Sequence, residues 1–297
     1  MGAAAQEPVL NSVAEIYPNS TPYQVNFTYD SQDRLTKVTN NEYTCESYTF
    51  DWTGYATGKM SYKFEDTDYP ESNTVYDVTL NANGYADKIV EKDQDGSTVY
   101  TVYTFKYDTD GYMTQVSILG DGEEGPEVYD ITYTAGSITS ILYTDKRVAA
   151  ELESYTIAVT PSDIPAKGCL AMYDDIYQID LDNADLATRA GLLGKVPAML
   201  PAKVDNTTEK DTYTYVWTVN TEGYPTALKS TEVYDGGTSE TNYTFNWGKN
   251  AGINAVQAEA DGVEAIYGLD GIRRNSLQQG INLVRRADGT VAKVLVK

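Results

Sequence analysis

The sequence repeats one pattern along most of its length: a strand of alternating residues, a short turn rich in Asp, Asn and Gly, and a second strand. Two clear copies lead from Phe105–Asp108 to Gly111 and from Tyr215–Val219 to Gly223. The glycine supplies the positive φ angle that a tight hairpin turn requires. Each copy is therefore predicted to be a β-hairpin, and successive copies predict an antiparallel meander.

The predicted strands have one apolar face and one polar face. In the strand at 213–219, aromatic and apolar residues occupy every second position, and the positions between them carry Thr214, Val216 and Thr218. This period of two is typical of antiparallel strands that pack on one side only. A meander of this many strands has to curl, close or pair its edges. We therefore expect an all-β protein in which an antiparallel meander forms a curved sheet or an incomplete barrel.

Residues 161–204 interrupt the strand pattern. Asp182–Ala190 can cap and start a short helix, and Gly191–Pro201 is apolar but punctuated by Gly and Pro. We expect this short helix and loop to plug the concave side of the sheet. The alternative is an amphipathic segment that binds a partner or a membrane, but the segment carries too little positive charge for the membrane version.

Composition suggests three parts. Residues 1–19 are expected to be an N-terminal extension, residues 20–260 the β-meander with its insertion at about 161–204, and residues 261–297 a small basic C-terminal β-tail. Residues 272–297 contain six Lys or Arg and one acidic residue, whereas the whole chain of 297 residues has a net charge of −22. The tail therefore differs in charge from the body.

The chain contains no histidine. This excludes Ser-His-Asp and Cys-His nucleophile systems and imidazole metal sites. The negative charge argues against nucleic-acid binding, because phosphates would repel the protein. A glycosidase needs only two carboxylates, but carboxylates at solvated turn tips have nothing to separate their pKa values. We expect no enzymatic activity, no catalytic residue and no cofactor.

Two acidic motifs resemble fragments of a calcium-binding loop, Asp93-Gln94-Asp95-Gly96 and Asp108-Thr109-Asp110-Gly111. A complete loop would add further ligands, including a glutamate at its twelfth position, and neither motif has one. Asp and Gly are also the residues of which hairpin turns are made. We interpret both motifs as turns, with weak divalent binding as the alternative, and predict no metal site.

The tryptophans Trp52, Trp217 and Trp247 fall on the apolar faces of their strands. Aromatic faces of this kind either pack in a core or stack on sugar rings, and we favour the core. The two cysteines, Cys45 and Cys169, allow one disulfide in an oxidising compartment, but two buried thiols are the simpler interpretation.

The hairpin array, the segment Ala190–Lys195 and the following Leu200-Pro201 resemble an uncharacterised family of secreted proteins and lipoproteins of gut Bacteroidota with a porin-like fold. The resemblance covers roughly residues 20–250. Residues 265–274, with 280–284 and 293–297, are similar to C-terminal tails of exported Bacteroidota proteins and to type IX sorting domains. The resemblance implies export, and it implies no catalytic residues.

We therefore expect a non-enzymatic, monomeric, exported protein that is periplasmic, outer-membrane-anchored or surface-exposed and binds a glycan or a peptide through residues that the sequence does not identify. A lipid anchor in a longer precursor would agree with the resemblance. The protein is not expected to span the membrane, because many alternating runs are shorter than the ~9–11 residues of a spanning strand. The alternatives are a structural or adhesive envelope component and, third, an outer-membrane pore.

Overall fold

The computed structural model describes residues 8–17, 20–148, 153–168, 172–206, 208, 210–248, 263–268, 273–274, 280–286 and 291–296. For the last four ranges, only the backbone, which forms strands, is described. Within all of these ranges, no helix is long and apolar enough to cross a membrane.

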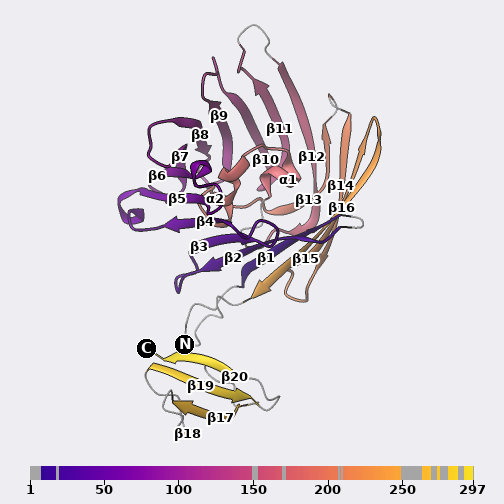
Figure 1. Cartoon of the computed structure of the whole chain (residues 1–297). Helices are drawn as coiled ribbons and strands as arrows, with labels where there is room; N and C mark the ends of the chain where they lie inside the picture. Colours follow the sequence, from indigo (N-terminus) through magenta and orange to yellow (C-terminus); the bar gives the residue numbers. More distant parts are fainter. Residues whose placement is uncertain are drawn as a thin grey trace. The chain divides into compact units, whose positions relative to one another are not determined.

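In the described residues, sixteen antiparallel strands form a closed barrel in which β1 pairs with β16 and every other strand pairs with its neighbours in sequence (Figure 1). Short turns or loops connect successive strands, as the repeat predicts, except between β12 and β13. The strands are β1 (Val9–Ile16), β2 (Tyr23–Tyr29), β3 (Leu35–Asn40), β4 (Glu46–Asp51), β5 (Lys59–Asp66), β6 (Thr74–Leu80), β7 (Ala86–Asp93), β8 (Val99–Tyr107), β9 (Met113–Gly120), β10 (Glu127–Thr134), β11 (Ser137–Asp145), β12 (Glu153–Pro165), β13 (Met199–Asn206), β14 (Asp211–Val219), β15 (Pro225–Tyr234) and β16 (Gly237–Gly248).

The barrel is closed, so the prediction of a curved sheet or an incomplete barrel is corrected. Closure depends on β1, which lies inside the range 1–19 that the sequence suggested was an extension. Val13 of β1 pairs with Phe245 of β16 on one side and with Val25 of β2 on the other. These pairings leave the sheet without a free edge, which removes the main route by which β-proteins aggregate.

The apolar faces of the strands point into the barrel, as their alternation predicts. Tyr62 and Tyr76 are fully buried and stack with ring centroids 4.4 Å apart and planes 3° from parallel. Trp217 stacks on Phe245 at 6.0 Å on another part of the wall. Stacked aromatic neighbours on adjacent strands stabilise the sheet from inside.

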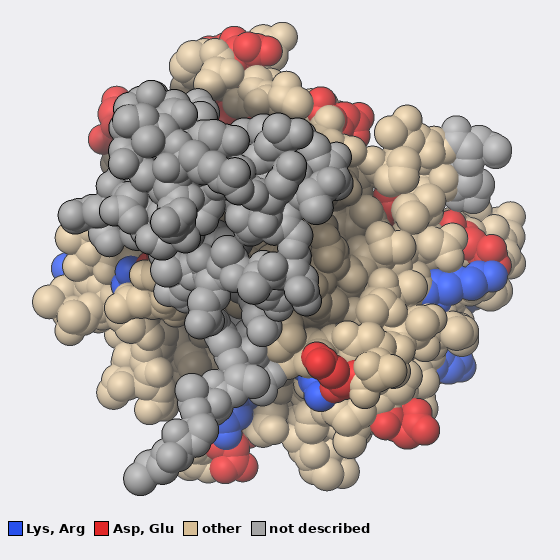
Figure 2. All heavy atoms as spheres, turned by 90° about the horizontal axis from the view of Figure 1, so that it is seen from below, with Lys and Arg blue, Asp and Glu red and all other residues tan. Residues whose placement is uncertain are grey.

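Charged side chains occur on the outer wall beside exposed apolar ones such as Leu142 and Val216. Lys63, Asp77 and Lys106 lie at outward positions of their strands and are exposed, and Lys229 forms an ion pair with Glu240 at 2.6 Å across β15 and β16. Figure 2 shows side chains of both charges scattered over the surface that it presents. The outer wall is therefore polar at the middle of its strands as well as at their ends.

The segment between β12 and β13 fills the barrel, as the sequence predicts. It contains helix α1 (Tyr173–Tyr177), the 3-10 turn η3 (Asp182–Asp185) and helix α2 (Leu186–Arg189). The predicted helix at 182–190 corresponds to η3 and α2, and α1 was not predicted. Ten apolar side chains among the described residues of this segment, which we call the plug, are buried: Met172, Tyr173, Ile176, Tyr177, Ile179, Leu181, Ala184, Ala187, Leu192 and Leu193.

The C-terminal unit of the chain contains four described strands, β17 (Val263–Gly268), β18 (Arg273–Arg274), β19 (Gly280–Arg286) and β20 (Val291–Val296). They form an antiparallel sheet in the order β18-β17-β19-β20. The strands lie within the residues 261–297 that the sequence suggested as a β-tail.

Candidate functional site

The plug meets one end of the barrel at successive turns of the wall. Leu192 O of the plug accepts a hydrogen bond from Ala86 N at 2.8 Å, and Lys195 N of the plug donates one to Gly111 O at 2.8 Å. A third bond joins Ala198 N to Gly136 O at 2.8 Å. We call this end, where the β6–β7, β8–β9 and β10–β11 turns contact the plug, the stoppered end.

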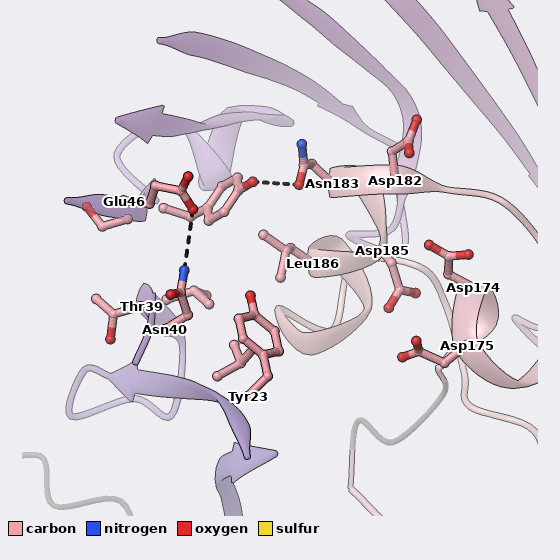
Figure 3. A pocket seen from close by; sticks show the side chains of 14 residues that line it. Tyr23, Thr39, Asn40, Glu46, Asp174, Asp175, Asp182, Asn183, Asp185 and Leu186 are labelled. Carbon is pink, nitrogen blue, oxygen red and sulfur yellow. Dashed lines mark hydrogen bonds between the residues drawn. The ribbon is translucent and has the colours of Figure 1, made fainter. Parts of the chain in front are cut away.

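A pocket of about 220 Å³ lies at the other end of the barrel, between the plug and the strands β2, β3 and β4 (Figure 3). A second cavity of about 180 Å³ shares five of its lining residues and reaches β1 and β16. We call the two together the mouth pocket. The residues common to both cavities are Tyr23, Val25, Asp175, Asp185 and Leu186.

One hydrogen-bonded group anchors the plug to the wall beside the pocket. Asn183 Oδ1 accepts a hydrogen bond from Tyr48 Oη at 2.5 Å, and Asn183 Nδ2 donates to Tyr76 Oη at 3.1 Å. The carbonyl of Asn183 accepts from Tyr62 Oη at 3.2 Å. Three tyrosines of the wall thus hold η3 in place and fix one edge of the pocket.

Carboxylates of the plug gather in the mouth pocket. Asp174 and Asp175 lie in the first turn of α1, Asp185 ends η3, and their side chains lie near one another (Figure 3). Asp174 and Asp175 are classed as exposed, although atoms of the plug and of the wall surround their carboxylates and desolvate them in part. This desolvation, with the neighbouring carboxylates as the smaller cause, raises the pKa of Asp174 to about 7 and that of Asp175 to about 6.

Arg189 is the positive group that faces this cluster from α2. Its side chain is buried, and its charge lowers the pKa of Asp175 and Asp185. Burial nevertheless raises the pKa of Asp185 above its usual range. Among the described residues that line the two cavities, six carboxylates accompany this one guanidinium: Glu15, Glu46, Asp174, Asp175, Asp182 and Asp185.

Acidity extends around the wall at the same end of the barrel. Inward-facing tyrosines donate hydrogen bonds to glutamates on neighbouring strands. These pairs occur on four separated parts of the wall: Tyr76 with Glu91, Tyr143 with Glu127, Tyr213 with Glu232, and Tyr243 with Glu15. Each of these glutamates thus accepts a hydrogen bond from a phenol hydroxyl of the wall.

Tyr103 lies deeper in the same acidic interior. Its side chain is 1% exposed, and among the described residues its hydroxyl meets no hydrogen-bond partner. Desolvation raises the pKa of this hydroxyl, and the charges of Glu91, Asp182 and Asp180 raise it further.

Among the described residues, no group of three or more Asp, Glu or Cys side chains has the spacing of a metal site. The motifs that resembled calcium loops form turns instead. Asp93 Oδ2 accepts from Ser97 Oγ at 2.7 Å and from Thr98 N at 3.1 Å, and Asp108 Oδ1 accepts from Tyr112 N at 2.9 Å. The turn interpretation of both motifs is confirmed.

The three tryptophans lie away from the mouth pocket. Trp217 is buried and donates to Pro201 O at 2.8 Å, which confirms its place in the core. Trp52 donates to Leu35 O at 2.7 Å, and Trp247 donates to Pro225 O; both are half-buried. Cys45 is a free thiol, and Cys169 lies outside the described residues.

The sequence analysis missed the carboxylates of the mouth pocket. A signal was present, because the twelve residues from 174 to 185 include five aspartates in a segment that was expected to be buried. Charges at that density inside a plug predict a water-filled space beside it, since a buried carboxylate without a partner is costly.

Comparison with known proteins agrees with the architecture. A family model described as a domain of unknown function (DUF4595) with porin-like fold matches residues 54–227. The crystal structure of a porin-like protein from Bacteroides uniformis is similar, with a TM-score of 0.61 and 19% identity over 80% of this chain and 96% of that one. A porin-like protein from Bacteroides vulgatus has a TM-score of 0.54 and 10% identity over 82% and 99%. No curated protein sequence matches the chain.

Proposed function

The chain belongs to the DUF4595 family with a porin-like fold, and we propose that it is a non-enzymatic, exported binding protein of the cell envelope. In this proposal the ligand, a glycan or a peptide, enters the mouth pocket. The observation that carries it is the asymmetry of the barrel: the plug joins the turns of one end and leaves a pocket of about 220 Å³ at the other. Binding sites are usually preformed concave pockets in which polar groups orient the ligand.

The charged residues of the outer wall favour a barrel that is surrounded by water rather than by lipid. A barrel in a membrane carries an apolar band on its outer face, and a Lys or Arg at the bilayer midplane costs about 2–4 kcal/mol. Lys63, Asp77 and Lys229 occupy the middle of their strands on that face. This arrangement favours a periplasmic or surface location, anchored or free, over a pore.

The location in the envelope rests on the relatives. The two similar structures are porin-like proteins of Bacteroides, and the resemblance of the C-terminal residues to exported tails points the same way. A structural or adhesive role without a small ligand is the second candidate, and it would leave the mouth pocket without an occupant.

A ligand screen with a filled pocket tests the proposal. Leu186 lines both cavities, so Leu186→Trp is expected to fill them, whereas Val216→Trp places the same side chain on the outer wall, where Val216 is 62% exposed. Glycan and peptide arrays should identify a ligand that the chain and V216W bind and L186W does not. Arrays with no binder above background, or equal binding by L186W, would refute the proposal.

A further inference from the structure

We propose that the loops β1–β2 (17–22), β3–β4 (41–45) and β5–β6 (67–73) form a docking surface for a polypeptide partner that presents lysine or arginine side chains, with Tyr43 and Tyr69 as aromatic anchors. We call these three loops the rim. The inference goes beyond the proposed function, because none of the described residues of the rim lines the mouth pocket. It follows from where the exposed tyrosines lie, how their loops are held, and which charges accompany them.

Exposed tyrosines gather at the mouth end of the barrel, opposite the stoppered end. Among the described residues six tyrosines are exposed, and alternate turns of an antiparallel barrel lie at the same end. Five of the six are therefore at the mouth end: Tyr17, Tyr43, Tyr69, Tyr100 and Tyr234. The first three belong to the rim and are 48%, 50% and 63% exposed. Single exposed apolar residues are common on any surface, whereas a group of exposed aromatic residues marks an interaction site.

Hydrogen bonds hold the two most exposed tyrosines on ordered turns. Asn40, which also lines the mouth pocket (Figure 3), accepts a hydrogen bond at Oδ1 from Tyr43 N at 2.5 Å. Asp66 Oδ1 accepts from Tyr69 N at 3.2 Å, and Tyr69 O accepts from Ser72 Oγ at 2.7 Å. Both rings nevertheless extend into solvent. Turns that are already fixed reduce the entropy that binding has to overcome.

The three loops also bond to one another. Asn41 accepts a hydrogen bond at Oδ1 from Gln24 N at 2.8 Å and donates from Nδ2 to Pro22 O at 2.9 Å, which joins the β3–β4 loop to the β1–β2 loop. Thr67 N donates to Cys45 O at 3.1 Å, which joins the β5–β6 loop to the β3–β4 loop. Since neighbouring strands lie about 4.8 Å apart, the three loops extend over about 20 Å, the length of about six residues of extended chain.

The composition of the rim is typical of a surface that binds proteins. Its loops contain Tyr, Ser, Thr, Asn and Pro but no Leu, Ile, Val or Phe. Tyr, Ser and Asn on loops of a β-scaffold also dominate antibody binding sites, where tyrosine supplies a large, rigid contact area. The sequence Tyr-Pro-x-Ser occurs at 17–20 and again at 69–72. In both copies the serine Oγ donates to the tyrosine carbonyl, from Ser20 to Tyr17 at 3.1 Å in the first. The same bond therefore holds a tyrosine at each end of the rim.

The charge of the rim favours a basic partner. Its loops contain the carboxylates of Glu42, Asp68 and Glu71 and no Lys or Arg. Tyrosine rings attract cationic side chains and carboxylates bind them, so a lysine or arginine of the partner would meet both kinds of group. A second copy of this chain would bring the same negative surface to the rim and be repelled. A glycan is ordinarily neutral or anionic and would gain no attraction from this charge.

The experiment selects peptides on the full chain from a displayed library of random twelve-residue sequences, and then measures the affinity of the selected peptides by fluorescence anisotropy. The test variant is Tyr43→Ser/Tyr69→Ser. The matched control is Tyr100→Ser/Tyr234→Ser, which removes two tyrosines of 41% and 42% exposure from the same end of the barrel. We expect the peptides to be rich in Lys or Arg and to bind Y43S/Y69S about tenfold or more weakly. Y100S/Y234S and L186W, whose mouth pocket is filled, should bind them as the parent chain does.

A second pair of variants tests the charge while the tyrosine rings stay in place. Glu42→Lys/Asp68→Lys reverses two charges of the rim and should also weaken binding of the selected peptides about tenfold or more. Asp87→Lys/Asp110→Lys makes the same reversal at exposed positions nearer the stoppered end and should leave the affinity unchanged. Thermal unfolding of each variant verifies that it folds as the parent chain does.

Several outcomes would overturn the inference. These are a library that yields no peptide above background, selected peptides without an excess of basic residues, and equal binding by Y43S/Y69S and Y100S/Y234S. Equal loss in E42K/D68K and D87K/D110K would replace the rim by a general attraction to an acidic protein. A glycan that the parent chain binds and Y43S/Y69S does not would assign the rim to sugars. Peptides that L186W loses and Y43S/Y69S keeps would overturn this inference and leave the proposed function standing.

Discussion

Gly194 of the plug is the residue whose replacement by alanine should disturb the stoppered end most clearly. Its φ angle is +80°, and a Cβ atom added there would lie 2.5 Å from Gly111 O and 2.9 Å from Cε1 of Tyr107. Gly191 is the matched position three residues earlier. Its φ angle is +73°, and nothing lies within 4 Å of the Cβ atom that it would acquire.

Both substitutions place an alanine in a left-handed backbone, but only Gly194→Ala also creates a steric overlap. The expected losses of folding stability therefore differ. A left-handed backbone costs an L-residue about 1–2 kcal/mol, which is the expected loss for Gly191→Ala. Gly194→Ala adds an overlap with a backbone carbonyl and an aromatic ring, and overpacking of this kind costs about 1–3 kcal/mol. We therefore expect a total loss of about 2–5 kcal/mol for G194A.

Equilibrium unfolding in urea, followed by tryptophan fluorescence, would compare the two variants with the parent chain. In thermal unfolding each kcal/mol should correspond to about 2–4 °C for a chain of this size. If G191A lost as much stability as G194A, the backbone angle alone would explain both, and the close approach of Gly194 to Gly111 and Tyr107 would be refuted.

Three further predictions concern the plug, the mouth and the closure of the barrel. Tyr215→Phe removes a buried hydrogen bond to Ile176 O (2.8 Å) and should cost about 1–3 kcal/mol in urea unfolding, while the exposed Tyr234→Phe should cost nothing measurable; equal effects would contradict the assigned bond. The folded chain raises the pKa of Asp174 to about 7 and that of Asp175 to about 6, above the usual aspartate value, so protonation of these groups stabilises the folded state increasingly as the pH falls from 8 to 5. The variant D174N/D175N should therefore show a flatter dependence of melting temperature on pH over this range. An unchanged dependence would argue against the raised pKa values. Deletion of residues 1–19 removes β1 and exposes the edges of β2 and β16, so size-exclusion chromatography should show larger oligomers or aggregates than the parent chain forms. Deletion of residues 1–7 should leave the elution volume of the parent chain unchanged, and an unchanged elution volume for the 20–297 chain would refute the role of β1.

The strands and the plug were predictable because their patterns are local. The alternation through Tyr213–Val219 specifies both a strand and its buried face, and β14 has these bounds within two residues. The strand β1 was not predicted because its register shifts between Leu10 and Ser12, which breaks the period of two. Helix α1, with five residues, is too short to show a helical period.

The mouth pocket could not be predicted from local patterns, since its walls come from distant parts of the chain. Tyr48 and Asn183 form one of its edges although 135 residues separate them. Only a closed barrel with the plug inside brings these groups together. The raised pKa values of the pocket carboxylates depend on the same enclosure and therefore have no counterpart in the sequence.

The pairing of β1 with β16 has a consequence for the order of assembly during synthesis. Every other pairing of the barrel joins neighbours in sequence, so the sheet can grow hairpin by hairpin as the chain emerges, and the plug is made before β13. The last step joins Val13 to Phe245, and a contact across so many residues forms late and slowly. A nascent chain that ends before Gly248 therefore keeps two open edges, and the lifetime of that intermediate sets its exposure to misassembly.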